Sequence, residues 1–97
     1  QDRDVCRAAV EALGKLGDPQ AVPHLIQALS DQDRDVCRAA VEALGKLGDS
    51  QAVPHLIETL SDQHLNKWVR RAAAEALRQI GTPEALEAVR QWEESQN

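Results

Sequence analysis

The same 31-residue unit is written twice in succession, and this repetition constrains the fold more than any other feature of the chain. Residues 1–31 and 32–62 agree at every position except three pairs: Pro19/Ser50, Gln27/Glu58 and Ala28/Thr59. A unit of this length is too short to bury a core alone, so neighbouring units must cover each other's apolar sides. The sequence therefore predicts a repeat array.

A diverged third unit follows the two near-identical ones. The segment VCRAAVEALGKLGD occupies positions 5–18 and 36–49, and VRRAAAEALRQIGT occupies positions 69–82. The third unit, residues 63–97, is offset by two residues because SDQHLN stands where the earlier junction has SDQD. We expect the three units to form a single domain of residues 1–97.

The spacing of apolar residues predicts two helices in each unit. In the first helix of the first unit, the apolar positions recur at intervals of three and four: Val5, Ala9, Ala12, Leu13 and Leu16. This spacing places them on one side of a helix and predicts that this side is buried. The second helix extends to about Leu29, and Pro23 near its start predicts a bend or a tightened opening turn. Its expected buried residues are Ala21, Val22, Leu25, Ile26 and Leu29.

Capping residues mark the ends of these helices. Good N-cap residues precede the first helix of each unit: Asp2, Asp33 and Asn66. Gly17 ends that helix in the left-handed conformation, and Asp18 then caps the second helix, whose first turn accommodates Pro19. The sequence thus predicts helix pairs joined by short Gly-Asp turns.

The two ends of the array differ in sequence. In the last helix, Arg90 and Glu93 stand where the first unit has the apolar residues Ile26 and Leu29, which indicates a charged C-terminal cap. Mid-helix glycines recur in the first two units and are expected to let the next unit approach closely, whereas Arg78 replaces this glycine in the last unit. The N-terminal end has no matching polar residues.

From this difference we expect part of the N-terminal core to be left partly exposed, at Val10, Ala21 or Leu25. Such an end predicts either an array truncated upstream or a chain that hides this end against a partner, which includes self-association through the uncapped N-terminal end.

Composition excludes several classes of function. The net charge of −5 argues against nucleic acid and anionic membranes as partners, because their phosphates require clustered Lys and Arg. A core of small aliphatic residues leaves little room for an organic cofactor, so none is expected. No apolar run approaches the roughly 18 residues that span a bilayer, and no signal peptide opens the chain, so a cytoplasmic protein is predicted. Cys6 and Cys37 occupy equivalent positions on adjacent units, too far apart for a disulfide or a zinc pair, so we expect free thiols.

These residues resemble a known family. The pattern of Val, two alanines, a Gly-Asp turn and an Ala-Val-Pro element is similar to the HEAT-like repeats of phycobilisome lyases and to artificial alpha-helical repeat proteins built from their consensus. The resemblance implies an all-α fold, a right-handed alpha-alpha superhelix of three antiparallel helix pairs. It also implies that the first helix of each pair lines a concave surface. Where the family has Arg after the Val, this chain has Cys6 and Cys37 and keeps only Arg70.

The residues outside the apolar stripe of the first helices form one continuous face, which the resemblance identifies as the concave ligand surface. Stacking aligns equivalent residues of the three units in rows. The predicted partner-binding face consists of Arg3, Asp4, Arg7, Glu11, Lys15, Arg34, Asp35, Arg38, Glu42, Lys46, Lys67, Trp68, Arg71 and Glu75. The alternative is a solvated face held by Arg-to-Glu and Glu-to-Lys pairs at i,i+4, which contribute little.

Trp68 replaces an Asp of the earlier units and is expected to be half exposed. An exposed Trp is typical of a contact anchor, although Trp68 could instead pack on the loop or cover Arg71. Trp92 is expected to act as a lid on the terminal core. The histidines His24 and His55 are expected to face solvent, and His64 to lie in the longer loop.

No catalytic constellation is present, because the sequence has no phosphate-binding loop, no His-Glu metal pairs and no nucleophile with a base. We therefore predict a non-enzymatic protein-binding or scaffolding module that uses the face of the first helices. Two alternatives stay open: a fragment of a phycobilin lyase or chaperone, and an engineered or truncated repeat array with no native ligand.

Overall fold

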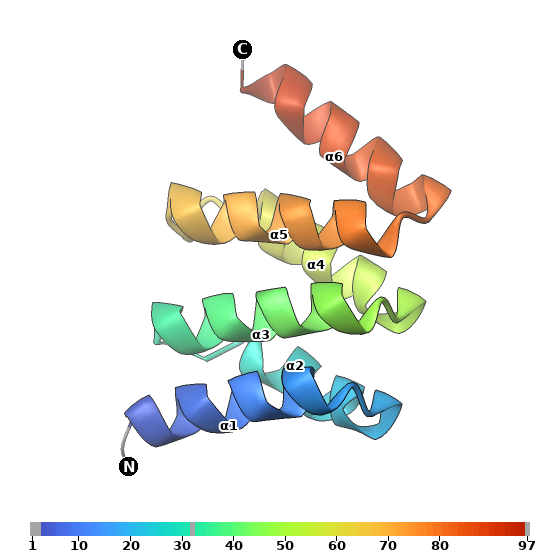
Figure 1. Ribbon diagram of the computed structural model, residues 1–97. Coiled ribbons are helices and arrows are strands. Elements are labelled where there is room, and N and C mark those ends of the chain that lie inside the picture. Colours follow the sequence, from blue (N-terminus) through green and yellow to red (C-terminus); the bar gives the residue numbers. More distant parts are fainter. Residues whose placement is uncertain (1–2, 32, 97) are drawn as a thin grey trace.

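The structure is a stack of helices in two layers. The computed structural model describes residues 3–31 and 33–96, with the side chains of residues 3–7 left out. Its elements are α1 (Arg3–Leu16), η1 (Pro19–Ala21), α2 (Val22–Ala28), α3 (Arg34–Leu47), η2 (Ser50–Ala52), α4 (Val53–Ser61), α5 (Lys67–Ile80) and α6 (Pro83–Ser95). In Figure 1, α1, α3 and α5 form one layer, α2 and α4 lie behind them, and α6 covers the C-terminal end. The chain is an α–α solenoid, as the repeats predict.

The caps that bound these helices follow the sequence closely. The carboxylate of Asp33 accepts a hydrogen bond from the backbone N–H of Asp35, and the side chain of Asn66 accepts one from that of Val69. Gly48 then ends α3 at φ 69°, a left-handed conformation in which a side chain would be strained. The predicted cap at Asp2 lies outside the described residues.

The outer helices open with a tightened turn, as the proline predicted. Asp18 accepts a hydrogen bond from the backbone N–H of Gln20 and begins the 3₁₀ helix η1, and Asp49 does the same for η2. The α-helical geometry starts only at Val22, one residue before Pro23. A proline this close to the helix start leaves no interior carbonyl without a partner.

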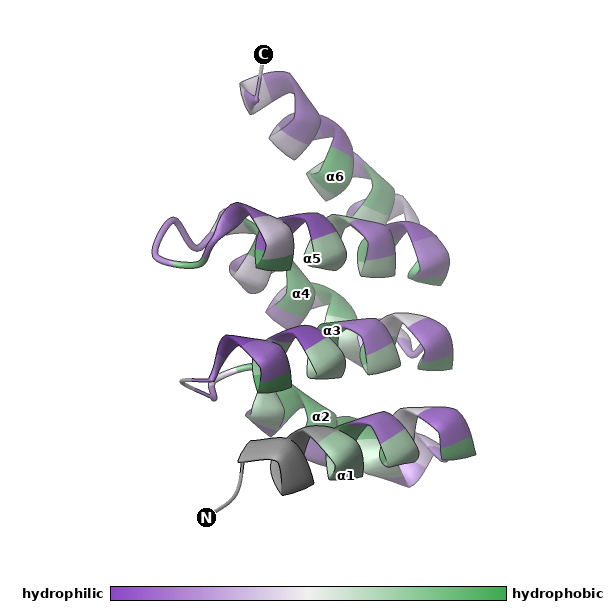
Figure 2. Cartoon of the chain, turned by 60° about the vertical axis from the view of Figure 1, so that its left-hand side comes forward, coloured by the Kyte–Doolittle hydropathy of each residue, from purple (hydrophilic) through white to green (hydrophobic). Residues whose placement is uncertain are grey.

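The core lies between the two layers and runs along the whole stack. Its largest fully buried side chains are leucines from successive elements, Leu25, Leu44, Leu56 and Leu77. Figure 2 shows hydrophobic residues gathered along α2 and α4, and hydrophilic residues along one side of α1, α3 and α5. Each inner helix after the first packs against both helices of the preceding pair, so α3 contacts α1 and α2.

Two glycines bring the inner helices into close contact, as predicted. A Cβ atom added to Gly14 would lie 2.6 Å from the Cβ of Ala43. One added to Gly45 would lie 2.9 Å from the Cα and Cβ of Ala76. Only glycine therefore allows this spacing of α1, α3 and α5.

The C-terminal end is closed by charged side chains. Arg78, which stands at the glycine position, forms ion pairs with Glu75 and Glu93. Arg90 is exposed and pairs with Glu87 and Glu94. The replacement of two apolar positions by Arg90 and Glu93 thus produces a polar outer surface, while Trp92 is half-buried against the core as a lid.

The prediction for the N-terminal end was wrong in its choice of residues. Val10, Ala21 and Leu25 are all buried, at 8%, 4% and 0% exposure. Val10 is covered because α2 and α3 pack against α1, and Leu25 lies on α2, which α3 contacts. The apolar stripe of α1 that was predicted to be buried is wrong as well: Ala9, Ala12 and Leu16 are exposed, Leu16 at 75%, and Leu13 is half-buried, because no helix of the described chain packs on that side.

No helix in residues 3–31 and 33–96 is both long and apolar enough to cross a membrane.

Candidate partner-binding face

Side chains of α3 and α5 line an open cavity of about 470 Å³. It is lined by Arg38, Glu42, Lys46, Trp68, Arg71, Ala72, Glu75, Ala76 and Gln79. Successive helical turns contribute these residues because they recur at intervals of three and four along each helix. The rows predicted from the repeats therefore come together on one surface, which we call the inner-helix face: the exposed residues of α1, α3 and α5 at these positions.

A second cavity of about 250 Å³ continues the inner-helix face between α1 and α3. It is lined by Glu11, Gly14, Lys15, Ala39, Glu42, Ala43 and Lys46. Glu42 and Lys46 border both cavities, so the surface is continuous across the three inner helices. The close approach of α1 and α3 at Gly14 forms the floor of this second cavity, which explains why it is the smaller of the two.

Trp68 is the most exposed aromatic residue of the described chain, at 64% exposure. The guanidinium carbon of Arg71 lies 5.6 Å from the centroid of the Trp68 ring, a cation–π contact. Because the two residues are three apart on α5, the contact holds the indole against the helix surface. The indole therefore has a defined orientation but remains open to a partner. Two predictions for Trp68 are confirmed: its side chain covers Arg71, and it is exposed.

Ion pairs on the inner-helix face are local and exposed. The Nε atom of Arg38 donates to Glu42 at 3.3 Å, the i,i+4 pair that the repeat predicts. Glu75 instead accepts from Arg78 at 2.7 Å, and its hydrogen bond is the main reason that the pKa of Arg78 is raised. These pairs leave Lys46 and Arg71 as cations with no ion pair within 4.0 Å among the described residues.

Charge is distributed unevenly over the molecule. In the described part of the chain, the inner-helix face and its rim carry six cations, Lys15, Arg34, Arg38, Lys46, Lys67 and Arg71, against four acids, Glu11, Asp35, Glu42 and Glu75. The remaining described side chains comprise three cations against ten acids. The face is therefore net positive by two charges in a chain whose net charge is −5. A local excess of this kind attracts anionic groups.

Three predicted face residues lie away from these cavities. Arg34 and Asp35 are exposed at the start of α3 but line neither cavity. Lys67 lines another cavity, of about 600 Å³, toward α6, with Arg78, Trp92 and Glu93. Arg71 and Glu75 border this cavity as well as the one of about 470 Å³. The splay of α6 away from α5, visible in Figure 1, opens this space. The side chains of Arg3, Asp4 and Arg7 are not among those that the structure describes.

The prediction missed two lining residues of the cavity of about 470 Å³. Ala72 and Ala76 follow Trp68 at intervals of four and form an apolar floor beside the indole. Gln79, which also lines this cavity, stands in the row predicted for it with Lys15 and Lys46. The spacing signal was present for both alanines, but small residues do not stand out from a predicted apolar stripe.

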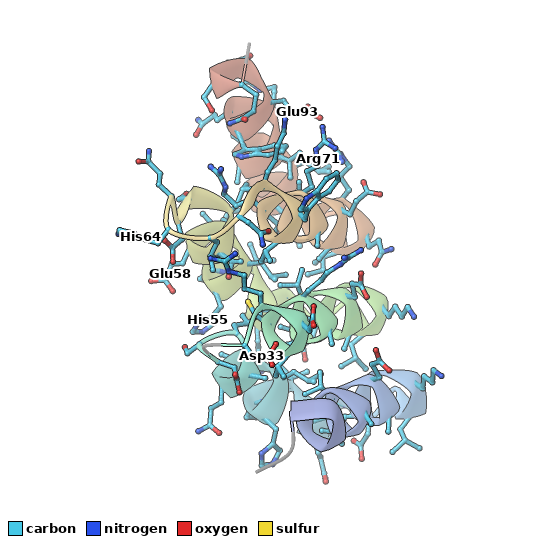
Figure 3. All side chains as sticks on the ribbon, turned by 90° about the vertical axis from the view of Figure 1, so that its left-hand side faces the viewer. Asp33, His55, Glu58, His64, Arg71 and Glu93 are labelled. Carbon is cyan, nitrogen blue, oxygen red and sulfur yellow. The ribbon has the colours of Figure 1, made fainter. Side chains whose placement is uncertain are left out.

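The other titratable candidates lie apart from this face. His55, Glu58 and His64 lie on one side of the stack and Arg71 on the other (Figure 3). His24, His55 and His64 are exposed, and the Nδ1 atom of His55 is 3.9 Å from a carboxylate oxygen of Glu58. Within the described residues, His, Cys, Asp and Glu form no group of three or more that could hold a metal ion.

Cys37 is a buried free thiol whose Sγ donates to the backbone oxygen of Leu29 at 3.3 Å. Burial raises the pKa of this thiol, and the nearby carboxylates of Asp31 and Asp62 raise it further. A neutral, buried thiol is a poor nucleophile, so its role here is to pack α3 against the end of α2. The side chain of Cys6 is not among those that the structure describes.

Comparison with known proteins identifies the repeat. A family model described as HEAT repeats matches residues 1–66 and again residues 24–97, so the two matches together cover the chain. Comparison with curated proteins gives no match. With its paired helices, its Gly-Asp turns and its continuous inner-helix face, the chain belongs to the HEAT-repeat family.

Proposed function

We propose that the inner-helix face binds an acidic segment of a partner protein, with Trp68 as the apolar anchor. HEAT repeats are commonly protein-interaction or scaffold modules and are generally non-catalytic. The observation that carries the proposal is the 64% exposed indole of Trp68 beside an open cavity of about 470 Å³. A large rigid side chain of this kind is desolvated at small cost in conformational entropy when a partner covers it.

The chemistry of the face supports a charged protein segment. Lys46 and Arg71 border the same cavity as Trp68, and no acid pairs with either of them among the described residues. A carboxylate on the partner would add an ion pair here, and the excess positive charge of the face would speed its approach. A tetrapyrrole is less suited to the site, because such cofactors occupy enclosed and mainly apolar pockets whereas these cavities are open.

Selection of peptides from a random library provides a direct test. We expect selected peptides to be acidic and to contain an apolar residue. Their affinity should fall at least about tenfold on Trp68→Ala, because an anchor of this type typically contributes more than about 1.4 kcal/mol. The matched control is Leu86→Ala, which shortens an exposed apolar side chain, 47% exposed, on α6.

Binding would be measured by titration calorimetry, with circular dichroism to confirm folding. Charge reversal by Lys46→Glu should weaken the same peptides, and salt should weaken binding to the unchanged chain. Peptides that bind the Trp68→Ala and Lys46→Glu chains as tightly as the original would overturn the proposal. So would a loss of binding confined to Leu86→Ala.

A further inference from the structure

A cavity of about 330 Å³ lies between α4, α5 and α6, and it shares no lining residue with the cavity of about 470 Å³ on the inner-helix face. These three helices contact one another and lie together at the C-terminal end of the stack in Figure 1. We call this cavity the Arg70 cleft, and its borders include Ile57, Leu60, Arg70, Ala88, Gln91 and Trp92. The proposed function of the inner-helix face does not use it.

Arg70 gives this cleft its charge. No Asp, Glu, Lys or His of the described chain lines it. The Arg70 side chain is half-buried and forms no ion pair within 4.0 Å with any described residue. Glu87 and Glu94, two acids of α6, pair with Arg90 instead. A half-buried guanidinium without a counter-charge favours the binding of an anion beside it.

Two buried hydrogen-bond donors at this cleft have no acceptor. The Nε atom of Arg70 and the Nε1 atom of Trp92 are both buried, and neither has a hydrogen-bond partner among the described residues. Buried N–H groups are almost always paired in folded proteins, because the loss of their hydrogen bonds to water is costly. An acceptor bound in the cleft would pair with both donors once the side chains that cover them move aside.

The cavity of about 670 Å³ between α2 and α4 is the equivalent of this cleft one unit earlier. Ile26 and Leu29 line it at the positions that Ile57 and Leu60 occupy in the cleft. A further helix pair, α5 and α6, follows this earlier cavity in the stack. The equivalent space therefore stays open where the array continues, so the cleft does not depend on what lies beyond α6.

The two equivalent cavities differ in charge. In the alignment that places Arg90 at the position of Ile26, three pairs of equivalent residues differ: Glu58/Gln91, Asp62/Ser95 and Cys37/Arg70. The earlier cavity is lined by the carboxylates of Asp31, Glu58 and Asp62, whereas the described residues that line the cleft include no carboxylate. The third unit thus has a cation and neutral residues where the second has acids, in a chain whose net charge is −5.

We propose that the Arg70 cleft binds a small organic carboxylate, which accepts hydrogen bonds from the guanidinium of Arg70 and the indole N–H of Trp92. The two oxygens of a carboxylate match the fork of a guanidinium group, and its single negative charge balances the single cation of the cleft. The hydrocarbon part of the ligand lies against Ile57 and Leu60. A volume of about 330 Å³ is at the lower end for ligand sites and suits a chain of a few carbons.

Hexanoate is the probe, and the indole N–H signals of the 15N-labelled chain in two-dimensional NMR are the readout. The signals of Trp68 and Trp92 are assigned with a Trp68→Phe chain. Hexanoate should move the Trp92 signal downfield and saturably, with a Kd of about 1 mM or tighter, because the N–H then donates to a carboxylate. Hexanamide has the same length without the charge and should bind at least about tenfold more weakly.

Arg70→Gln should weaken hexanoate binding at least about tenfold, because it removes the counter-charge and the fork of donors. Arg90→Gln changes the net charge equally on the exposed side of α6 and is the matched control, with a change in Kd below about twofold. Arg70→Cys restores the residue of the earlier units and serves if Arg70→Gln fails to fold by circular dichroism.

Three results would overturn the proposal. One is the absence of a Trp92 shift in the folded, unchanged chain at about 20 mM hexanoate, well above the expected Kd. Another is equal binding of hexanoate by the folded Arg70→Gln or Arg70→Cys chain. The third is equal binding of hexanamide by the unchanged chain, which would mean that the cleft takes up hydrocarbon without recognising the carboxylate.

Discussion

The helices α1 and α3 have the same sequence and the same length, yet their side chains meet different surroundings. Both contain fourteen residues between the same kinds of flanking residue. Leu44 of α3 is completely buried, whereas its equivalent Leu13 in α1 is half-buried. The comparison teaches that a local sequence determines the helix and its caps, while burial depends on which other helices lie beside it. Identical pairs of residues therefore serve as internal controls.

The largest difference is expected for truncation of the paired leucines. Leu44→Ala should lower the free energy of unfolding by about 2–5 kcal/mol, because it leaves a cavity in a fully covered core. Leu13→Ala should cost about half as much or less, since the side chain is already partly in water. Urea unfolding followed by circular dichroism measures both. Equal losses would mean that Leu13 is covered as completely in solution as Leu44.

Enlargement of the paired alanines should give the next largest difference. Ala43→Leu adds three carbons where the Gly14 position is already in close contact, and overpacking of this kind costs about 1–3 kcal/mol. Ala12→Leu extends into open solvent and should change the free energy of unfolding by less than about 0.5 kcal/mol. Thermal unfolding of the two variants in parallel provides the measurement. A destabilising effect of Ala12→Leu would show that Ala12 is packed as closely by its neighbours as Ala43 is.

The Cys37 thiol reports on the other side of α3, which faces the end of α2. Its raised pKa means that the folded chain holds the proton more tightly than the unfolded chain does. Stability should therefore be complete below the ordinary thiol pKa of about 8.5 and should fall as pH rises above it. In a Cys6→Ser chain, alkylation of the single remaining thiol at pH 8 should be at least about tenfold slower folded than in urea. Rapid alkylation of the folded chain would contradict the observed burial.

The smallest effect is expected on the exposed inner-helix face. Arg38→Ala removes an exposed ion pair to Glu42 and should change the free energy of unfolding by no more than about 0.5 kcal/mol. Arg38→Lys, which keeps the charge, is the matched variant. Denaturant titrations at low and high salt give the comparison. A loss above about 1 kcal/mol would show that this face holds the stack together, which the buried leucines otherwise explain.

Much of the local structure could be predicted because it depends on neighbours in sequence. Asp33, Asn66 and Asp18 cap their helices as expected, and Gly48 has the left-handed conformation that a helix end favours. The mid-helix glycine also indicated a close helix contact, because its intrinsic cost of about 1 kcal/mol relative to alanine required a packing reason.

The wrong predictions concern contacts between elements. Val10 was expected to be partly exposed but is buried, whereas Ala9, Ala12 and Leu16 were expected in a buried stripe but are exposed. Spacing along α1 shows which residues share a side of the helix, but not which side the neighbouring helices cover.

The sequence by itself determined that the chain is a HEAT-type array, which residues cap α3 and α5, and that one end carries charge in place of apolar side chains. These properties follow from backbone hydrogen bonding and from the period of the helix, which act over a few residues. Only the tertiary structure decided which side of α1 remains in contact with water, and that Trp68, Lys46 and Arg71 border one cavity. Helix packing sets these features, because it brings together side chains that no spacing along a single helix relates.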